Sequence, residues 1–239
     1  MEFLQTIEWA AVLKIIGIDI MLGVDNAIVI ALACAALPAE VRNRAIIWGT
    51  AGAIGLRAIL LVFAGFLMGL PYVKLIAGAY LLFLGYKLLM SNDEAHDVAP
   101  ADRIMTAIKT IIVADFMMSL DNVLAVTAAA QAAGEHSTIY AILGIILSIP
   151  VIIFGAKGLM QLMEKFPIII WLGAGLLGWV GMEMMITDHF SADFMAAMVQ
   201  TLGSHAAHIF QLGGFLIVIV AAFLMRKLKR NSGSTTAAA

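Results

Sequence analysis

Two aspartates and an asparagine recur at one spacing in two apolar stretches of the sequence. Each copy reads Asp, five residues, Asp-Asn, and the second copy follows the first by 96 positions. The six residues are Asp19, Asp25, Asn26, Asp115, Asp121 and Asn122. An ionisable side chain within a membrane-spanning segment costs at least about 2.5 kcal/mol and usually marks a functional site. The repetition therefore predicts a site of function.

These side chains offer oxygen ligands to a cation. Carboxylate, amide and backbone carbonyl oxygens suit hard divalent cations such as Mg²⁺, Ca²⁺ and Mn²⁺, and no His or Cys lies near either copy to favour zinc or copper. On a continuous helix Asp19 and Asp25 would be about 120° and about 9 Å apart. One shared site therefore predicts that the helix opens near Gly23, and near Ser119 in the second copy. The alternative is two separate pairs, each bonded across helices.

The charge of the four aspartates limits the chemistry of such a site. Fully ionised they would sum to −4, and Arg57, which falls within a predicted span, would return +1. Protons or a bound cation must balance the remainder in a medium of low dielectric constant. We expect Arg57 to be the counter-ion of the aspartates; the alternative is a side chain that snorkels to the membrane surface. Glu183 is either a peripheral ligand or proton relay, or the solvated end of a helix.

The composition places these motifs in a membrane protein. Hydrophobic residues make up 63% of the 239 residues and charged residues 13%, and the mean hydropathy is +1.02. Apolar runs repeat along nearly the whole chain, which excludes a soluble domain and predicts an all-α, polytopic membrane protein. The single Cys34 excludes an internal disulfide framework and a cysteine metal cluster.

Turn and charge signals divide the chain into seven predicted transmembrane helices. Pro71 and Gly85 return as Pro167 and Gly181 at the offset of the motifs, so two three-helix repeats precede one C-terminal helix. Three crossings per repeat would invert the second repeat, as in many secondary transporters. The predicted parts are a first repeat at 1–90, a cytoplasmic loop at 91–102, an inverted repeat at 103–187, an external segment with helix seven at 188–230 and a disordered tail at 231–239.

The basic residues predict how the chain is oriented in the membrane. Eleven of the 14 lysines and arginines flank the seven predicted helices on one side, whereas only Lys74 flanks them on the other. Because cytoplasmic flanks are rich in Lys and Arg, the N-terminus should lie outside and the C-terminus in the cytoplasm. Residues 40–44 are expected to form a polar cytoplasmic loop, and helix seven is expected to end near Met225.

The doubled motif also carries a resemblance. Gly23-Val24-Asp25-Asn26-Ala27 and Ser119-Leu120-Asp121-Asn122-Val123, in a duplicated seven-helix chain, resemble the TerC family of integral membrane proteins and its compact YjbE-type branch. The likeness spans residues 7–225. It implies an inner-membrane (plasma membrane) protein of manganese efflux or metal supply, with the six motif residues at its site. The family name also refers to tellurite, an oxyanion that an acidic site would repel.

These observations predict a secondary transporter, and not an enzyme, that exports a divalent cation. Mn²⁺ is the leading substrate, and exchange for protons is one way to balance the charge. No cofactor beyond the transported ion is expected. The expected partners are the metal ion and the lipid bilayer, and no nucleic acid is expected. The sequence is compatible with a homo-oligomer. Alternatives are an exporter of Ca²⁺ or an amino acid, and an intramembrane aspartyl protease, whose usual Gly-x-Gly-Asp setting is absent. A third alternative is a non-transporting accessory subunit of a secretion complex.

Overall fold

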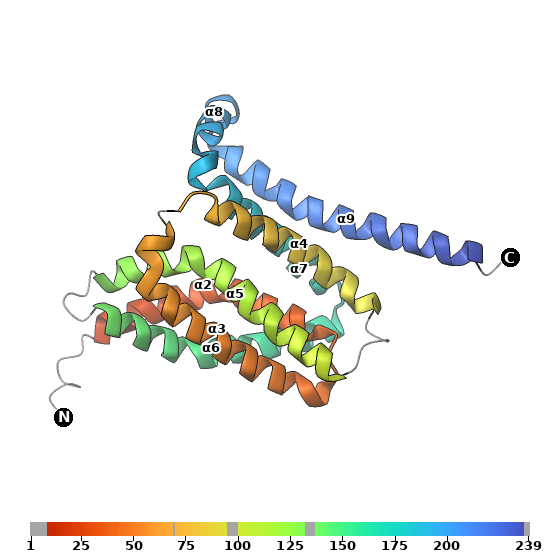
Figure 1. Ribbon diagram of the computed structural model, residues 1–239, viewed down its shortest axis with the longest axis horizontal. Coiled ribbons are helices and arrows are strands. Elements are labelled where there is room, and N and C mark those ends of the chain that lie inside the picture. Colours follow the sequence, from red (N-terminus) through yellow and green to blue (C-terminus); the bar gives the residue numbers. More distant parts are fainter. Residues whose placement is uncertain (1–8, 69, 95–99, 132–136, 237–239) are drawn as a thin grey trace. The chain divides into compact units, whose positions relative to one another are not determined.

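The computed structural model describes residues 9–68, 70–94, 100–131 and 137–236, and these segments are helical apart from short connections. Seven long helices follow one another (Figure 1): α2 (Trp9–Ala35), α3 (Ala39–Met68), α4 (Val73–Glu94), α5 (Pro100–Gln131), α6 (Ser137–Lys165), α7 (Ile168–Ile186) and α9 (Ala206–Thr236). A short helix, α8 (Ala192–Leu202), lies between the 3₁₀ turns η1 (His189–Ser191) and η2 (Gly203–His205). The all-α prediction is confirmed for the described residues.

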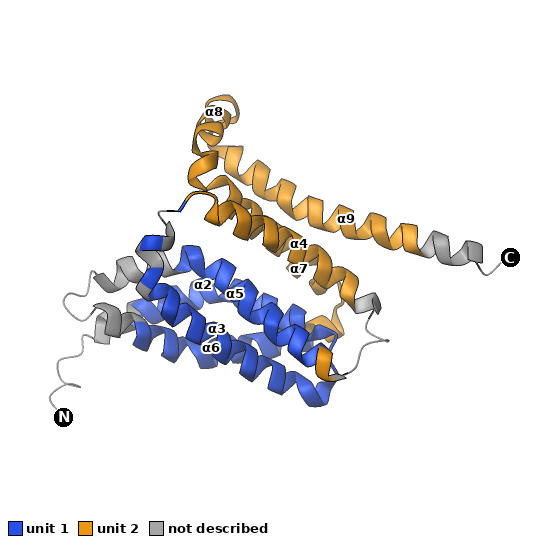
Figure 2. Cartoon of the chain, viewed as in Figure 1, with its two compact units in different colours: residues 1–70, 103–161 blue, residues 71–102, 162–239 orange. Residues whose placement is uncertain are grey.

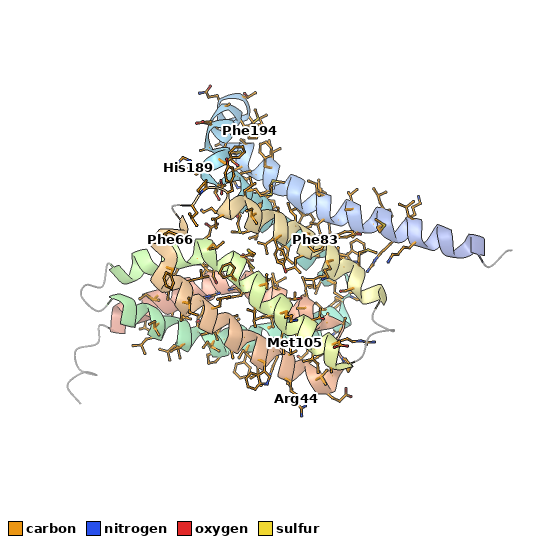
Figure 3. The ribbon with its side chains drawn as sticks, viewed as in Figure 1. Arg44, Phe66, Phe83, Met105, His189 and Phe194 are labelled. Carbon is orange, nitrogen blue, oxygen red and sulfur yellow. The ribbon has the colours of Figure 1, made fainter. Side chains whose placement is uncertain are left out.

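Among the described residues, six segments are long and apolar enough to cross a membrane: Ile15–Ala35, Ala39–Leu61, Val73–Ser91, Ile142–Lys165, Ile168–Ile186 and His189–Lys229. The helix α5 is not among them on its described residues, which include Arg103, Lys109, Asp115 and Asp121. Large apolar side chains such as Phe66, Phe83 and Phe194 are exposed on the helices (Figure 3), as lipid-facing side chains would be. The chain is therefore a multi-pass helical membrane protein.

Several helix ends differ from the sequence prediction. The loop predicted at 91–102 is helical at 91–94, where α4 ends, and at 100–102, where α5 begins; residues 95–99 lie outside the described chain. The helix α3 begins at Ala39, so residues 40–44 form its first turns and not a loop. The carbonyl of Pro38 accepts backbone N–H bonds from Val41 and Arg42, and Arg42 Nε donates to the Leu37 carbonyl at 2.8 Å. Glu40 lies in the first turn, where a negative charge is favourable beside the positive end of the helix dipole. At the other end, α9 continues past Met225 to Thr236, into the tail expected to be disordered; residues 237–239 lie outside the described chain.

The chain forms two compact units (Figure 2). Unit 1 comprises residues 1–70 and 103–161, and unit 2 comprises residues 71–102 and 162–239. Unit 1 thus contains the first two helices of each predicted repeat, α2, α3, α5 and α6. Unit 2 contains the third helix of each repeat, α4 and α7, together with α8 and α9. The units interleave along the chain, and each draws on both repeats.

Within unit 1, helices from different repeats pack side by side in parallel pairs. Asp19 of α2 meets Ser148 of α6, and Gly23 meets Ile152 four residues farther along both helices. Likewise, Gly49 of α3 packs on Ile111 of α5, and Arg57 contacts Ser119 eight residues farther along both. A constant separation between contacting residues means that each pair runs in one direction. Both pairs place a motif helix against a helix of the other repeat.

The expected opening of the motif helices is wrong. The helix α2 is continuous through Gly23, and α5 is continuous through Ser119. A methyl group at Gly23 would lie 3.0 Å from Ile152 Cδ1, so the absent side chain permits a close helix contact. The hydroxyl of Ser119 is engaged with two charged side chains, described below, and not with a freed backbone group. Gly23 therefore serves helix packing, and Ser119 serves side-chain bonding.

Within unit 2, α4 and α7 cross so closely that small residues are needed. A methyl group at Gly181 would lie 2.6 Å from the Gly78 carbonyl oxygen, and one at Gly85 would lie 2.7 Å from the Ala174 carbonyl oxygen. The contact runs up α4 as it runs down α7, so the two helices are antiparallel. At the offset of 96 positions, Gly78 corresponds to Ala174 and Gly85 to Gly181. The two contacts are therefore exchanged by the repeat, which is the pattern of an interface with two-fold symmetry.

Candidate functional site

The guanidinium of Arg57 joins the two motifs inside unit 1. The residue lies on α3 and is 4% exposed. Its Nη1 donates to Asp19 Oδ1 at 2.9 Å, and its Nη2 donates to Asp115 Oδ1 at 2.6 Å. Its Nε donates to Ser119 Oγ at 3.0 Å. One planar group thus holds the first aspartate of each motif copy, through the charge-assisted bonds for which arginine is suited.

A serine completes the bonding of each carboxylate. Ser119 Oγ, one turn after Asp115 on α5, donates to Asp115 Oδ2 at 3.2 Å. Ser148 Oγ, on α6, contacts Asp19 Oδ2 and also lies 2.8 Å from the Ile145 carbonyl oxygen. The first motif has Gly23 at the position of Ser119, so its hydroxyl partner comes from a neighbouring helix. Each carboxylate is therefore bound by the guanidinium through one oxygen and by a hydroxyl through the other.

Two carboxylates share one guanidinium in a desolvated place. The Asp19 side chain is fully buried, and that of Asp115 is 12% exposed. With both carboxylates ionised and Arg57 protonated, the three groups sum to −1. Removing one member of a buried ion pair costs about 3–5 kcal/mol because the other charge stays behind uncompensated. The arrangement therefore requires a cation at its centre, and Arg57 fills that role here.

A small cavity adjoins this cluster. Its volume is about 20 Å³, and its polar lining comes from Thr50, Arg57, Asp115 and Ser148. The remaining wall is apolar and consists of Ala53 and five isoleucines, Ile30, Ile54, Ile145, Ile149 and Ile152. All these residues belong to unit 1. Such a volume accommodates about one water-sized species.

The later residues of the motifs lie farther along the same helices. Because α2 is continuous, Asn26 is about 10 Å along the helix axis from Asp19. Asn26 is 3% exposed, and neither its Oδ1 nor its Nδ2 has a hydrogen-bond partner among the described residues. Asp25, Asp121 and Asn122 are partly buried. The structure thus brings the first aspartates together on Arg57, about two helical turns before the Asp-Asn pairs.

No group of three or more His, Cys, Asp or Glu side chains forms a ready metal cluster within the segments described above. Glu183 lies exposed on α7 in unit 2, near the end of that helix. Asp188, by contrast, is buried and accepts backbone N–H bonds from Phe190 at 2.9 Å and Leu75 at 3.2 Å. That carboxylate therefore caps the turn after α7 and joins it to the start of α4.

Comparison with known proteins decides the family. The sequence profile of the integral membrane protein TerC family matches residues 4–234. The chain belongs to the TerC family. The match covers all the described helices apart from the last residues of α9, and so contains both motif copies, Arg57 and most of each unit.

Individual relatives agree with this assignment. The chain is 41% identical over 194 residues to the uncharacterized membrane protein YjbE of Bacillus subtilis, which covers 80% of this chain and 87% of that protein. It is 26% identical to the uncharacterized membrane protein YkoY of the same organism, over 73% of this chain and 59% of that protein. It is 24% identical to the UPF0053 inner membrane protein YgdQ of Escherichia coli, over 74% of this chain and 81% of that protein. No solved structure matches the chain.

In this TerC-family chain, sequence reasoning missed two polar residues that line the cavity, Thr50 and Ser148. Neither belongs to a motif, and hydroxyl side chains are common enough in membrane helices to attract no notice. A weak signal existed for Ser148, because Pro150 two residues later removes a backbone donor within α6. For Thr50 the only signal is a lone hydroxyl within an apolar helix.

The geometry also bears on the chemistry that this TerC-family site can perform. Intramembrane aspartyl proteolysis requires two carboxylates that share one proton. Here a guanidinium lies between Asp19 and Asp115 and bonds to one oxygen of each, so the two carboxylates do not bond to each other. Such an arrangement suits the binding and exchange of cations and does not suit a proton-sharing pair.

Proposed function

We propose that this TerC-family protein is a secondary transporter that exports a divalent metal cation, Mn²⁺, in exchange for protons. One observation carries the proposal. Asp19 and Asp115, the first aspartates of the two motif copies, meet on the single buried guanidinium of Arg57. A membrane-embedded pair of carboxylates that needs a cation between them can exchange one cation for another.

The charge balance supports a divalent ion. If Arg57 withdraws from the carboxylates, a divalent cation neutralises both of them. When the ion leaves, the guanidinium returns and a proton balances the remaining negative charge. Arg57 therefore acts as a tethered cation that occupies the site while the substrate is absent. The oxygen ligands suit hard cations, and the resemblance of the doubled motif to manganese exporters selects Mn²⁺ among them.

We further propose that the two three-helix repeats are inverted and that the site is reached alternately from the two sides of the membrane. Reciprocal contacts between α4 and α7 support this arrangement, since the repeat exchanges Gly78–Gly181 with Gly85–Ala174. Helices that cross the membrane in alternate directions run parallel when they are two or four apart. The parallel packing of α3 with α5, and of α2 with α6, supports α5 as a crossing too. Rocking of one repeat against the other would then open the site to either side.

The proposal is tested by manganese export from cells. Asp19→Asn and Asp115→Asn each remove one negative charge and keep the shape of the side chain. Cells that express either variant should accumulate manganese and grow poorly in excess manganese, whereas cells with the wild-type protein should not. Met21→Leu is a suitable control, since Met21 is 70% exposed and only its sulfur is lost. Full protection by both aspartate variants, at equal expression, would contradict the proposed site.

A further inference from the structure

The hydroxyl of Thr50 is a buried polar group without a partner. Thr50 lies on α3, is 4% exposed, and its Oγ1 has no hydrogen-bond partner among the described residues. A threonine within a helix can usually bond to the carbonyl four residues earlier, and Thr50 does not. Buried polar groups are nearly always satisfied, so an exception points to a missing ligand, water or ion. The residue lines the cavity beside Arg57.

Three oxygen-bearing side chains face this cavity from three helices. They are Thr50 of α3, Asp115 of α5 and Ser148 of α6. The hydroxyl proton of Ser148 is directed to Asp19 or to the Ile145 carbonyl, which leaves lone pairs of its oxygen for another contact. The unbonded Thr50 oxygen likewise offers lone pairs. The cavity therefore offers a hard cation three side chains with oxygen donors, which is part of the six or more ligands that such an ion takes.

The volume and the charge restrict what can enter. A cavity of about 20 Å³ holds one water-sized species, and so admits a cation without its hydration shell but excludes an amino acid. With both carboxylates ionised, the adjoining group of Asp19, Asp115 and Arg57 sums to −1, so a cation is attracted and an anion is repelled. Five isoleucines complete the wall and offer no competing ligands.

We propose that Thr50 Oγ1, Ser148 Oγ and the Asp115 carboxylate hold the transported cation in this cavity after it has lost most of its water. The inference rests on the proposed export function and adds two ligands that neither motif contains. Entry of the ion competes with the Arg57 guanidinium for Asp115, because that carboxylate serves both. Thr50 is thus a binding residue whose partner is the substrate.

Thr50→Val tests this inference by two measurements that move in opposite directions. Valine has nearly the shape of threonine, so the change removes an unsatisfied hydroxyl and leaves the packing in place. The metal-free variant should melt at a temperature equal to or above that of the wild-type protein. Its affinity for Mn²⁺ should fall about tenfold, the effect of losing roughly one good contact.

Binding is measured on purified full-length protein in detergent by titration with manganese chloride. The electron paramagnetic resonance signal of hydrated Mn²⁺ disappears on binding, and thermal unfolding in chelator gives the metal-free stability. Thr50→Ser keeps the hydroxyl and should bind nearly as the wild type does. Thr110→Val, on α5 and outside the cavity lining, should change neither quantity. Ser148→Ala should weaken binding in the same assay.

The outcomes separate the two proposals. If the wild-type protein binds neither Mn²⁺ nor Ca²⁺, the proposed export function fails, and this inference fails with it. If the wild type binds and both Thr50→Val and Ser148→Ala bind equally well, the export function stands and the cavity is not the binding position. A Thr50→Val protein that is less stable without metal but binds normally would show that the hydroxyl serves the fold, which also overturns the inference.

Discussion

Replacement of Arg57 by methionine should make the stability of the protein depend on metal. Arg57→Met keeps an unbranched side chain and removes two ion pairs, at 2.9 and 2.6 Å, and the bond to Ser119 at 3.0 Å. It leaves the carboxylates of Asp19 and Asp115 buried without their cation. Removal of one partner from a buried pair costs about 3–5 kcal/mol, so the metal-free variant should be destabilised by this amount.

A divalent cation should reverse much of that loss. A ligand at a hundred times its dissociation constant stabilises the folded state by about 2.7 kcal/mol. In the wild-type protein the ion must first displace the guanidinium, which offsets part of this stabilisation. Mn²⁺ should therefore raise the melting temperature of Arg57→Met more than that of the wild type. Intrinsic tryptophan fluorescence in detergent, with chelator or with manganese chloride, measures both effects.

The matched control is Arg44→Met, which removes an exposed arginine from the first turns of the same helix. It should change stability by less than about 0.5 kcal/mol, as surface substitutions usually do. The reasoning is refuted if Arg57→Met in chelator is as stable as the wild type. It is also refuted if manganese stabilises the two proteins equally, because the guanidinium would then not compete with the ion.

Three further results are expected. In a double-mutant cycle, Arg57→Met and Asp115→Asn together should destabilise the protein by about 0.5–3 kcal/mol less than the sum of the single changes; strict additivity would contradict the ion pair. Gly78→Ala should destabilise the protein by about 1–3 kcal/mol, because its methyl group meets a backbone carbonyl across the α4–α7 contact. Gly55→Ala should not destabilise the protein, because the space around Gly55 is open. Equal melting temperatures of the Gly78→Ala and Gly55→Ala proteins would contradict the close α4–α7 packing. A cysteine at Arg44 should react with impermeant maleimide only from the cytoplasmic side; labelling in intact cells would overturn the predicted orientation.

The helices of this fold could largely be predicted from the sequence, because long apolar runs leave little choice in a membrane. The start of α3 was misplaced by hydropathy, since Glu40 and its polar neighbours resemble a loop. In the structure they form first turns in which Pro38 accepts backbone bonds and Arg42 binds the Leu37 carbonyl. Polar residues at a membrane surface are compatible with a loop and with the first turns of a helix, so composition alone cannot distinguish the two.

The site was predicted in its residue types and less well in its geometry. The motif spacing identified Asp19 and Asp115 among six candidates and could not show that these two share Arg57, because that contact depends on how distant helices pack. Gly23 was interpreted as a point of helix opening, whereas it provides room for Ile152. Thr50 gave no pattern at all, since its importance arises from the cavity it faces.

The most direct test of the central claim is Mn²⁺ flux in proteoliposomes that contain only the purified protein. The account predicts saturable Mn²⁺ transport by the wild type, accompanied by proton movement in the opposite direction. Transport should fall at least tenfold in Asp19→Asn and in Asp115→Asn. A tenfold fall corresponds to a loss of about 1.4 kcal/mol in the binding free energy of the ion. Transport of Ca²⁺ or of an amino acid in its place would correct the substrate. Absence of any cation flux from correctly inserted protein, or equal flux in both aspartate variants, would contradict the account.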